Sequence, residues 1–341
     1  MSTRVSTGGQ RIDRSKPVSF PFNGQNLKGY EGDTLASALL ANDKMMLGRS
    51  FKYHRPRGLV ASGTEEPNAL LGIGEGARFE PNQRATMQEV FDGLVSISQN
   101  HWPSLEFDIG EVNAKLNRFF PAGFYYKTFM WPRSFWKHVF EPIIRQSAGL
   151  GKAPKEQDAD TYEHYYHFCD VLVVGGGIAG LTAALAAASG GAKVTLMEQE
   201  NAFGGRTVVD QPDLSGAVDE MVTKLKGMDN VRVVRRCMAA GVYDHGYVLG
   251  YERLTDHLSK KEGPRHRLWR IRAGQVITAT GAIERPLSFA GNDIPGVMLA
   301  AAVRDYLVNF GVSLGDRTVV VTNNDDAYLT AIKLAEAGLS V

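Results

Sequence analysis

The alternation of apolar and polar residues predicts a strand hairpin followed by a helix near the N-terminus. Val18–Phe22 alternates as a strand does, a hairpin turn signal follows it, and Gln25–Tyr30 can return as the partner strand. Leucine and alanine then recur at helical spacing over residues 35–40, with Asp33 or Thr34 as the N-cap. A hairpin followed by a helix is typical of the start of a ferredoxin-like β-grasp domain.

Changes in composition along the chain suggest four segments. A loose polar leader covers residues 1–15, and the ferredoxin-like β-grasp domain covers 16–100. Residues 101–167 are crowded with aromatic side chains and broken by prolines, which favours a connector packed flat over other domains. A substrate-binding aromatic cage is the alternative for this segment. Buried-strand and helix patterns follow over 168–341, as in an α/β domain.

The α/β pattern begins with a strand, a glycine turn, a helix and a second strand. Val171–Val174 is a continuous apolar run, as expected of a buried parallel strand. Leu181–Ser189 is strongly helical, and Val194–Met197 is a second apolar run. Strand, helix and strand within about 30 residues form a βαβ unit.

The turn between the first strand and the helix carries the spacing Gly-x-Gly-x-x-Gly. Gly175 permits the tight turn, Gly177 lets the backbone approach a pyrophosphate, and Gly180 lets helix and strand pack closely. The pyrophosphate would lie at the helix N-terminus, where free N–H groups favour negative charge. Glu198 ends the second strand 18 residues after Gly180, where a carboxylate binds ribose hydroxyls and repels a 2′-phosphate. FAD or NAD is therefore favoured over NADP, and a glycine-rich turn without a ligand is the alternative.

Later segments extend this candidate site. Gly204 and Gly205 follow the acid, where a backbone loop can lie along the pyrophosphate. Arg206 either neutralises phosphate charge or is a solvated surface arginine. Thr280 and Gly281 end an apolar run of the kind that returns to the cofactor in two-dinucleotide flavoproteins.

A second strand-and-helix pattern starts at Thr318–Val321 and continues over 326–338. Asparagine and aspartate replace the glycines of its turn and would crowd a pyrophosphate, so we do not expect a second dinucleotide there. The chain stops at Val341, inside or just after a strand. We therefore expect the N-terminal part of a longer protein.

Composition narrows the functional classes. Among the 341 residues, 38 lysines and arginines balance 37 aspartates and glutamates, so neither nucleic acid nor an anionic membrane is favoured as a partner. The longest apolar runs are far shorter than a membrane span. Cys169 and Cys237 are the only cysteines, which fits a reducing, cytoplasmic setting.

The chain resembles the α subunit of heterotetrameric sarcosine oxidase from about Lys16 onward. The resemblance is carried by residues 32–42, 48–58, 65–69, 170–181, 243–248, 279–286 and 322–328. It implies a ferredoxin-like domain, an NAD-binding two-dinucleotide domain of the Rossmann-like FAD/NAD(P) type, and a C-terminal folate-binding domain that is absent here. It also implies beta, gamma and delta partner subunits.

The resemblance further implies a reaction that takes place outside this chain. FAD and covalently attached FMN would be held by the beta subunit, which carries the amine oxidation site. The complex would demethylate sarcosine to glycine, reduce O2 to H2O2 and form 5,10-methylenetetrahydrofolate. Residues carried over as NAD contacts are Ala179, Glu198, Gln199, Glu200, Arg206 and Ala239. Arg206 and Ala239 depart from the family, which has a threonine and a larger aliphatic residue there.

The ferredoxin-like domain contains no cysteine, so we expect no iron–sulfur cluster and a structural or interface role. No residue is identified as a catalytic acid, base or nucleophile. His54 lies in a basic loop and is expected to have a structural or interface role. The cluster of Arg49, Lys52, Arg55 and Arg57 either forms a solvated face or faces the partner subunit.

Two alternatives remain. One is an α-type subunit of an opine or imino-acid dehydrogenase; relatives of that kind often carry cluster cysteines. The other is a truncated, non-catalytic fragment that binds a nucleotide.

Overall fold

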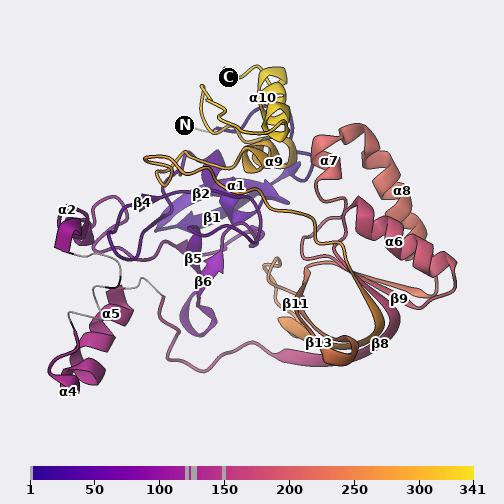
Figure 1. Cartoon of the computed structure of the whole chain (residues 1–341), viewed down its shortest axis with the longest axis horizontal. Coiled ribbons are helices and arrows are strands. Elements are labelled where there is room, and N and C mark those ends of the chain that lie inside the picture. The colour runs from indigo at the N-terminus through magenta and orange to yellow at the C-terminus, as the bar shows by residue number, and fades with distance from the viewer. Residues whose placement is uncertain (1–2, 120–122, 124–128, 148–150) are drawn as a thin grey trace. The chain divides into compact units, whose positions relative to one another are not determined.

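The computed structural model describes residues 3–119, 123, 129–147 and 151–341 (Figure 1). The chain forms two compact units, one made of residues 1–159 with 284–341 and the other of 160–283. None of the helices in the described ranges is long and apolar enough to cross a membrane.

The first unit contains a five-stranded mixed sheet in the order β2-β1-β7-β5-β6. Its strands are β1 (Asp13–Phe22), β2 (Gln25–Glu31), β5 (Leu70–Ile73), β6 (Glu80–Arg84) and β7 (Ser96–Ile97), and a separate pair is β3 (Gly48–Arg49) with β4 (Pro56–Arg57). The helices are α1 (Leu35–Ala41), α2 (Val112–Lys115), α4 (Arg133–Phe135), α5 (Glu141–Ser147), α9 (Ala300–Phe310) and α10 (Asp326–Glu336).

The predicted hairpin and helix are confirmed at the start of this unit. β1 and β2 pair antiparallel with Phe22 opposite Gln25, and every residue of α1 is buried. Thr34 is the N-cap, since its side chain accepts from the Ser37 amide and the Ser37 hydroxyl accepts from the Thr34 amide. This reciprocal pair satisfies amide groups at the start of a short helix.

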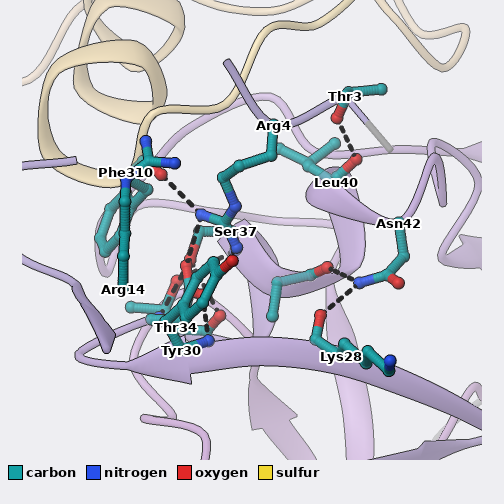
Figure 2. A network of polar contacts seen from close by, with 12 residues as sticks. Thr3, Arg4, Arg14, Lys28, Tyr30, Thr34, Ser37, Leu40, Asn42 and Phe310 are labelled. Carbon is teal, nitrogen blue, oxygen red and sulfur yellow. Dashed lines mark hydrogen bonds and ion pairs between the residues drawn. The ribbon is translucent and has the colours of Figure 1, made fainter. Parts of the chain in front are cut away.

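Asp33 is an anchor for the N-terminal segment rather than the helix cap. Its side chain is fully buried and forms an ion pair with Arg4, whose Nη2 lies 2.7 Å from Oδ2. Figure 2 shows Arg4 also donating to the carbonyl of Phe310, at the end of α9. The expected loose leader is therefore tied to the core over residues 3–12, where the Val5 amide also donates to Gly311.

The C-terminal segment packs in the first unit, although we expected 168–341 to form one domain. Tyr306 and Phe310 of α9 lie in the same apolar core as Phe20 and Leu35. The Tyr306 hydroxyl donates to the carbonyl of Ala61 at 3.0 Å. Because burial of these large side chains is strongly favourable, the segment packs with the first unit although it follows the second unit in sequence.

The predicted strand at Thr318–Val321 is not formed. Only Arg317, directly before it, makes an isolated parallel bridge, to Ser340, and Val319 and Val321 are more than two-thirds exposed. Apolar spacing produces a strand only when a neighbouring edge supplies hydrogen bonds. The helix expected after it is present as α10.

Several aromatic side chains of the connector are exposed. Trp102, Phe107, Phe119 and Trp131 are each at least two-thirds exposed. Phe120, Tyr125 and Tyr126 lie outside the described residues.

The second unit is a six-stranded sheet in the order β10-β9-β8-β13-β12-β11. Its strands are β8 (Tyr162–Val174), β9 (Val194–Met197), β10 (Val231–Val234), β11 (Cys237–Tyr243), β12 (Tyr247–Arg253) and β13 (His266–Thr278), and its helices are α6 (Ile178–Ser189), α7 (Thr207–Asp210) and α8 (Ser215–Lys226). The four strands from β10 to β13 in this order run parallel, and β12 and β11 are antiparallel additions.

Two apolar layers cover the faces of this sheet. Helices α6 and α8 lie on one face of the sheet (Figure 1). Leu181 of α6 and Leu225 of α8 pack there with Val173 and Leu196. On the other face, Trp269 of β13 packs with Leu172 in a cluster that also includes residues of the antiparallel strands. The predicted βαβ unit is confirmed as β8, α6 and β9.

Candidate functional site

The strand order reverses at β8, so that its carboxyl end lies between two neighbouring strands reached from opposite directions along the chain. From β8 the chain proceeds through β9 to β10 on one side, whereas β13 returns to pair with β8 on the other side. Ligands of open parallel sheets bind at such a reversal, outside the carboxyl ends of the strands. The glycine turn begins there, directly after Val174.

Two of the three motif glycines are required by close backbone packing. Gly175 has a φ of +105°, and a Cβ there would lie 2.3 Å from the carbonyl oxygen of Ala279. A Cβ at Gly180 would lie 1.8 Å from the carbonyl oxygen of Gly175. Both distances are far below van der Waals contact, so helix, turn and β13 can approach only because these side chains are absent.

The third motif glycine faces open space. A Cβ at Gly177 would have no heavy atom within 4 Å. Gly177 is the N-cap of α6, and no side chain caps this helix. Ala179, in the first turn of α6, is exposed. An uncapped helix N-terminus beside an unobstructed glycine has room and amide donors for an anionic group.

Glu198 follows β9 and holds the glycine turn directly. Its Oε2 accepts from the Gly176 amide at 2.6 Å, and its Oε1 accepts from the Glu200 amide at 2.9 Å. Glu198 is only 8% exposed. A buried carboxylate with backbone donors on both oxygens fixes the turn and places negative charge beside it.

Gln199 and Glu200 lie next to Glu198 and are half-buried. Arg253 donates to the carbonyl of Gln199 at 3.2 Å, and the Arg236 amide donates to the carbonyl of Glu200 at 2.9 Å. The loop after β9 is therefore tied to the loop after β10 and to the end of β12.

The glycine pair after Glu198 lies against the motif. The Gly204 amide donates to the carbonyl of Gly176 at 2.9 Å, and a Cβ at Gly205 would lie 3.3 Å from the Cα of Gly177. Arg206 forms an ion pair with Asp210 one turn later, with 2.8 Å between Nη2 and Oδ1. Arg206 thus has a protein partner beside the turn.

The remaining expected contacts differ in position. Thr280 and Gly281 directly follow Ala279, whose amide donates to Val174, so they begin at the same edge of the sheet. Both are exposed. Ala239 instead lies within β11, opposite Gly250.

Cys237, which begins β11, donates its amide to the carbonyl of Glu198 at 2.8 Å. Burial, with Glu252 nearby, raises the pKa of the Cys237 thiol far above its usual range. Burial also raises the pKa of the Cys169 thiol. Both cysteines are buried free thiols that remain protonated at neutral pH.

The basic loop of the first unit is partly internal. Arg49 is 6% exposed and donates to the carbonyls of Leu105, Glu106 and His54. The His54 Nδ1 lies 2.5 Å from an oxygen of Asp108. Arg49 therefore joins the loop to the start of the connector, a role that its sequence context did not indicate.

Phe203 is a site residue that sequence reasoning missed. A Cβ at Gly176 would lie 2.5 Å from the Phe203 ring, so this ring packs over the turn. Its position directly before Gly204 was the available signal. An apolar residue there closes the loop onto the motif.

Family models match both parts of the chain. One described as "2Fe-2S iron-sulfur cluster binding domain" matches residues 15–101, and one described as "Pyridine nucleotide-disulphide oxidoreductase" matches residues 169–322. The chain is 50% identical over 337 residues to sarcosine oxidase subunit alpha from Rhizobium meliloti (strain 1021), covering 97% of this chain and 34% of the relative. It is 35% identical to the protein of the same name from Corynebacterium sp. (strain U-96), covering 98% of this chain and 31% of the relative.

A solved structure shares the fold. The L-proline dehydrogenase of P. horikoshii matches with a TM-score of 0.65 and 22% identity, covering 100% of this chain and 55% of that one. The chain spans about a third of the length of the two curated relatives.

The match over residues 15–101 corrects our expectation about the first domain. We expected a ferredoxin-like domain without an iron–sulfur cluster, whereas the matching model describes a cluster-binding domain. The donor set of this segment does not fit a cluster held by thiolates, because residues 15–101 contain no cysteine. In the described part of the chain, histidine, cysteine, aspartate and glutamate also form no group of three or more that could hold a metal.

Proposed function

We propose that this chain, which is homologous to sarcosine oxidase subunit alpha over 97% of its length, binds NAD at the glycine turn of its second unit. The observation that carries the proposal is the open space at Gly177, combined with the close packing that excludes side chains from Gly175 and Gly180. A side chain is absent at Gly177 although the protein itself leaves room for one. A ligand pyrophosphate supplies the reason.

The polarity of the site supports a pyrophosphate at this place. The N-terminus of α6 presents backbone amides and the positive end of the helix dipole. Gly204 and Gly205 bring a second backbone segment beside Gly177. We assign Arg206 to the outer side of the phosphates, where its pair with Asp210 would orient it.

The adenosine end of the ligand would lie towards β9. We propose that Glu198 accepts hydrogen bonds from the ribose hydroxyls, with Gln199 and Glu200 beside it. Its negative charge disfavours a 2′-phosphate, so NAD is preferred to NADP. We place the adenine near Ala239, and Thr280 and Gly281 beside the other end of the pyrophosphate.

A comparison of nucleotides by isothermal titration calorimetry tests this proposal. NAD is expected to bind with about 1:1 stoichiometry, and NADP at least about tenfold more weakly, which corresponds to about 1.4 kcal/mol. Equal affinity for both would refute the assigned role of Glu198, and no binding of either would refute the site.

We further propose that the chain acts as the NAD-binding part of a cytoplasmic sarcosine oxidase complex. Its relatives are named as sarcosine oxidase subunits, and the family model that matches residues 169–322 is described as a pyridine nucleotide-disulphide oxidoreductase. In this proposal the amine is oxidised in a partner beta subunit, with gamma and delta subunits completing the complex. Sarcosine is converted to glycine with formation of H2O2 and 5,10-methylenetetrahydrofolate.

Co-purification with a candidate beta subunit tests the division of labour. Sarcosine-dependent H2O2 production is expected from the assembled complex and not from this chain alone. Oxidation of sarcosine by the isolated chain would contradict the assignment of the reaction to a partner.

A further inference from the structure

Glu66 lies at the centre of a loop whose backbone amides converge on its carboxylate. Oε2 accepts from the amides of Val60 and Ala61, both at 2.7 Å. Oε1 accepts from the amides of Asn68 at 2.7 Å and Ala69 at 3.2 Å. All four backbone amides donate to this one carboxyl group, which favours its anionic form.

This carboxylate is enclosed by the first unit. Glu66 is 1% exposed, and Ala61 and Ala69 on either side of it are equally buried. The loop is pinned from α9, because Tyr306 donates to the carbonyl of Ala61 and the Leu299 amide donates to the carbonyl of Val60. Burial raises the pKa of the Glu66 carboxyl, and the four amides oppose that shift.

Concavities of converging backbone amides bind anions, and iron–sulfur clusters are among the anions bound in this way. The loop belongs to the segment matched by the cluster-binding domain model. In plant-type clusters the first three cysteine ligands have the spacing C-x4-C-x2-C. Ala61, Glu66 and Ala69 have this spacing.

A fourth position follows from the packing around the loop. Thr86 lies beyond β6, is 3% exposed, and donates its hydroxyl to the carbonyl of Gly63 at 2.7 Å. Its side chain thus reaches into the loop from a later part of the chain. The plant-type pattern also takes its fourth ligand from further along the sequence.

We propose that Ala61, Glu66, Ala69 and Thr86 occupy the ligand positions of the matched cluster-binding domain, and that the Glu66 carboxylate receives the loop amides that would face the cluster. The loop keeps the conformation of a cluster-binding loop because one internal anion organises the same donors. Glu66 then explains why the segment matches a cluster-binding domain although it contains no cysteine ligands.

The first test compares Glu66→Gln with Glu65→Gln in the full chain. An amide group at position 66 turns one acceptor atom into a donor, which leaves two loop amides unpaired. The melting temperature of E66Q is expected to fall by at least about 4 °C. Glu65 is exposed, and E65Q is expected to melt as the wild type does. Equal melting of the two variants would overturn the role of Glu66.

The second test installs cysteine at the four positions, as A61C/E66C/A69C/T86C. After anaerobic reconstitution with ferrous iron and sulfide, this variant is expected to retain about two iron and two sulfide per chain and to absorb in the visible range. The matched control, A61C/E65C/A69C/T86C, shifts one thiol onto an exposed position and is expected to retain neither.

The two tests together leave no neutral outcome. A folded A61C/E66C/A69C/T86C variant that retains no more iron than its control would overturn the assignment of ligand positions. If that variant does not fold, the difference in melting between E66Q and E65Q decides the proposal.

Discussion

Alanine at Gly177 and at Gly180 should have opposite effects on ligand binding and folding. At Gly180 the new Cβ would lie 1.8 Å from the carbonyl oxygen of Gly175, whereas ordinary contact begins near 3.4 Å. The helix or the turn must therefore shift by more than an ångström. At Gly177 the Cβ would meet no atom of the protein, and the local φ of −73° and ψ of 178° are accessible to alanine.

The magnitudes follow from these distances. Overpacking of this kind lowers the free energy of unfolding by about 1–3 kcal/mol. Each kcal/mol corresponds to roughly 2–4 °C in melting temperature, so a loss of about 3 kcal/mol lowers the melting temperature of G180A by about 6–12 °C. In G177A the loss of a glycine N-cap costs less than about 1 kcal/mol, so the melting temperature stays within about 4 °C of wild type. The methyl group at 177 would occupy the space assigned to the pyrophosphate, so we expect NAD affinity to fall at least about tenfold.

Differential scanning calorimetry and titration calorimetry on the same preparations measure both effects. A G177A variant that binds NAD as tightly as wild type would refute the placement of the pyrophosphate. A G180A variant with unchanged melting would refute the packing argument for the turn.

Three further predictions concern individual side chains. Glu198→Gln should weaken NAD binding at least about tenfold in titration calorimetry and reduce the preference for NAD over NADP, because the end of β9 loses its negative charge. An unchanged preference for NAD would contradict the assigned role of Glu198. Arg4→Ala should lower the free energy of unfolding by about 3–5 kcal/mol in urea titrations, because it leaves Asp33 buried without its counter-ion. The control Lys16→Ala removes an exposed ion pair with Glu31 and should lower the free energy of unfolding by less than about 1 kcal/mol. Equal losses in the two variants would contradict the anchoring role of Asp33. Burial, with Arg232 and Lys193 nearby, lowers the pKa of His167 from 6.5 to about 4. As the pH decreases from about 6.5 to about 4, the unfolded chain therefore takes up a proton before the folded chain does, and the folded state loses stability. His167→Gln should reduce that loss when urea midpoints at pH 7 and pH 4.5 are compared, and an unchanged pH dependence would contradict this role of His167.

Local signals were sufficient for the elements that depend on neighbouring residues. The hairpin of β1 and β2 and the unit of β8, α6 and β9 were predictable because their hydrophobic periods and turn residues are continuous in sequence. The sequence left Asp33 and Thr34 open as the helix cap, and the structure assigns it to Thr34. β8 nevertheless begins at Tyr162, earlier than its apolar run indicates. Exposure alternates along residues 162–170, where only His167 and Cys169 are buried, and the tyrosine, histidine and glutamate side chains there obscure the strand pattern.

Features that depend on distant partners were not predictable. The packing of 284–341 with the first unit depends on a core completed by Phe20 and Leu35. The strand expected at Thr318–Val321 needed a neighbouring edge that its own sequence does not specify.

The site itself was predictable in outline and not in detail. The motif glycines and Glu198 indicated a turn and an acid. The bond from Gly176 to Glu198 depends on the depth to which the carboxylate is buried. The amides around Glu66 are likewise arranged by packing from α9 and by Thr86.

The nucleotide carried by the purified chain tests the NAD assignment most directly. Heat denaturation of the chain, followed by chromatography and mass spectrometry of the released small molecules, identifies a bound dinucleotide without assuming its identity. NAD at up to about one per chain, lost in G177A and retained in Lys16→Ala, is the expected result. Release of FAD, or wild-type chain that neither carries NAD nor takes it up when it is added, would contradict the assignment of the glycine turn to NAD.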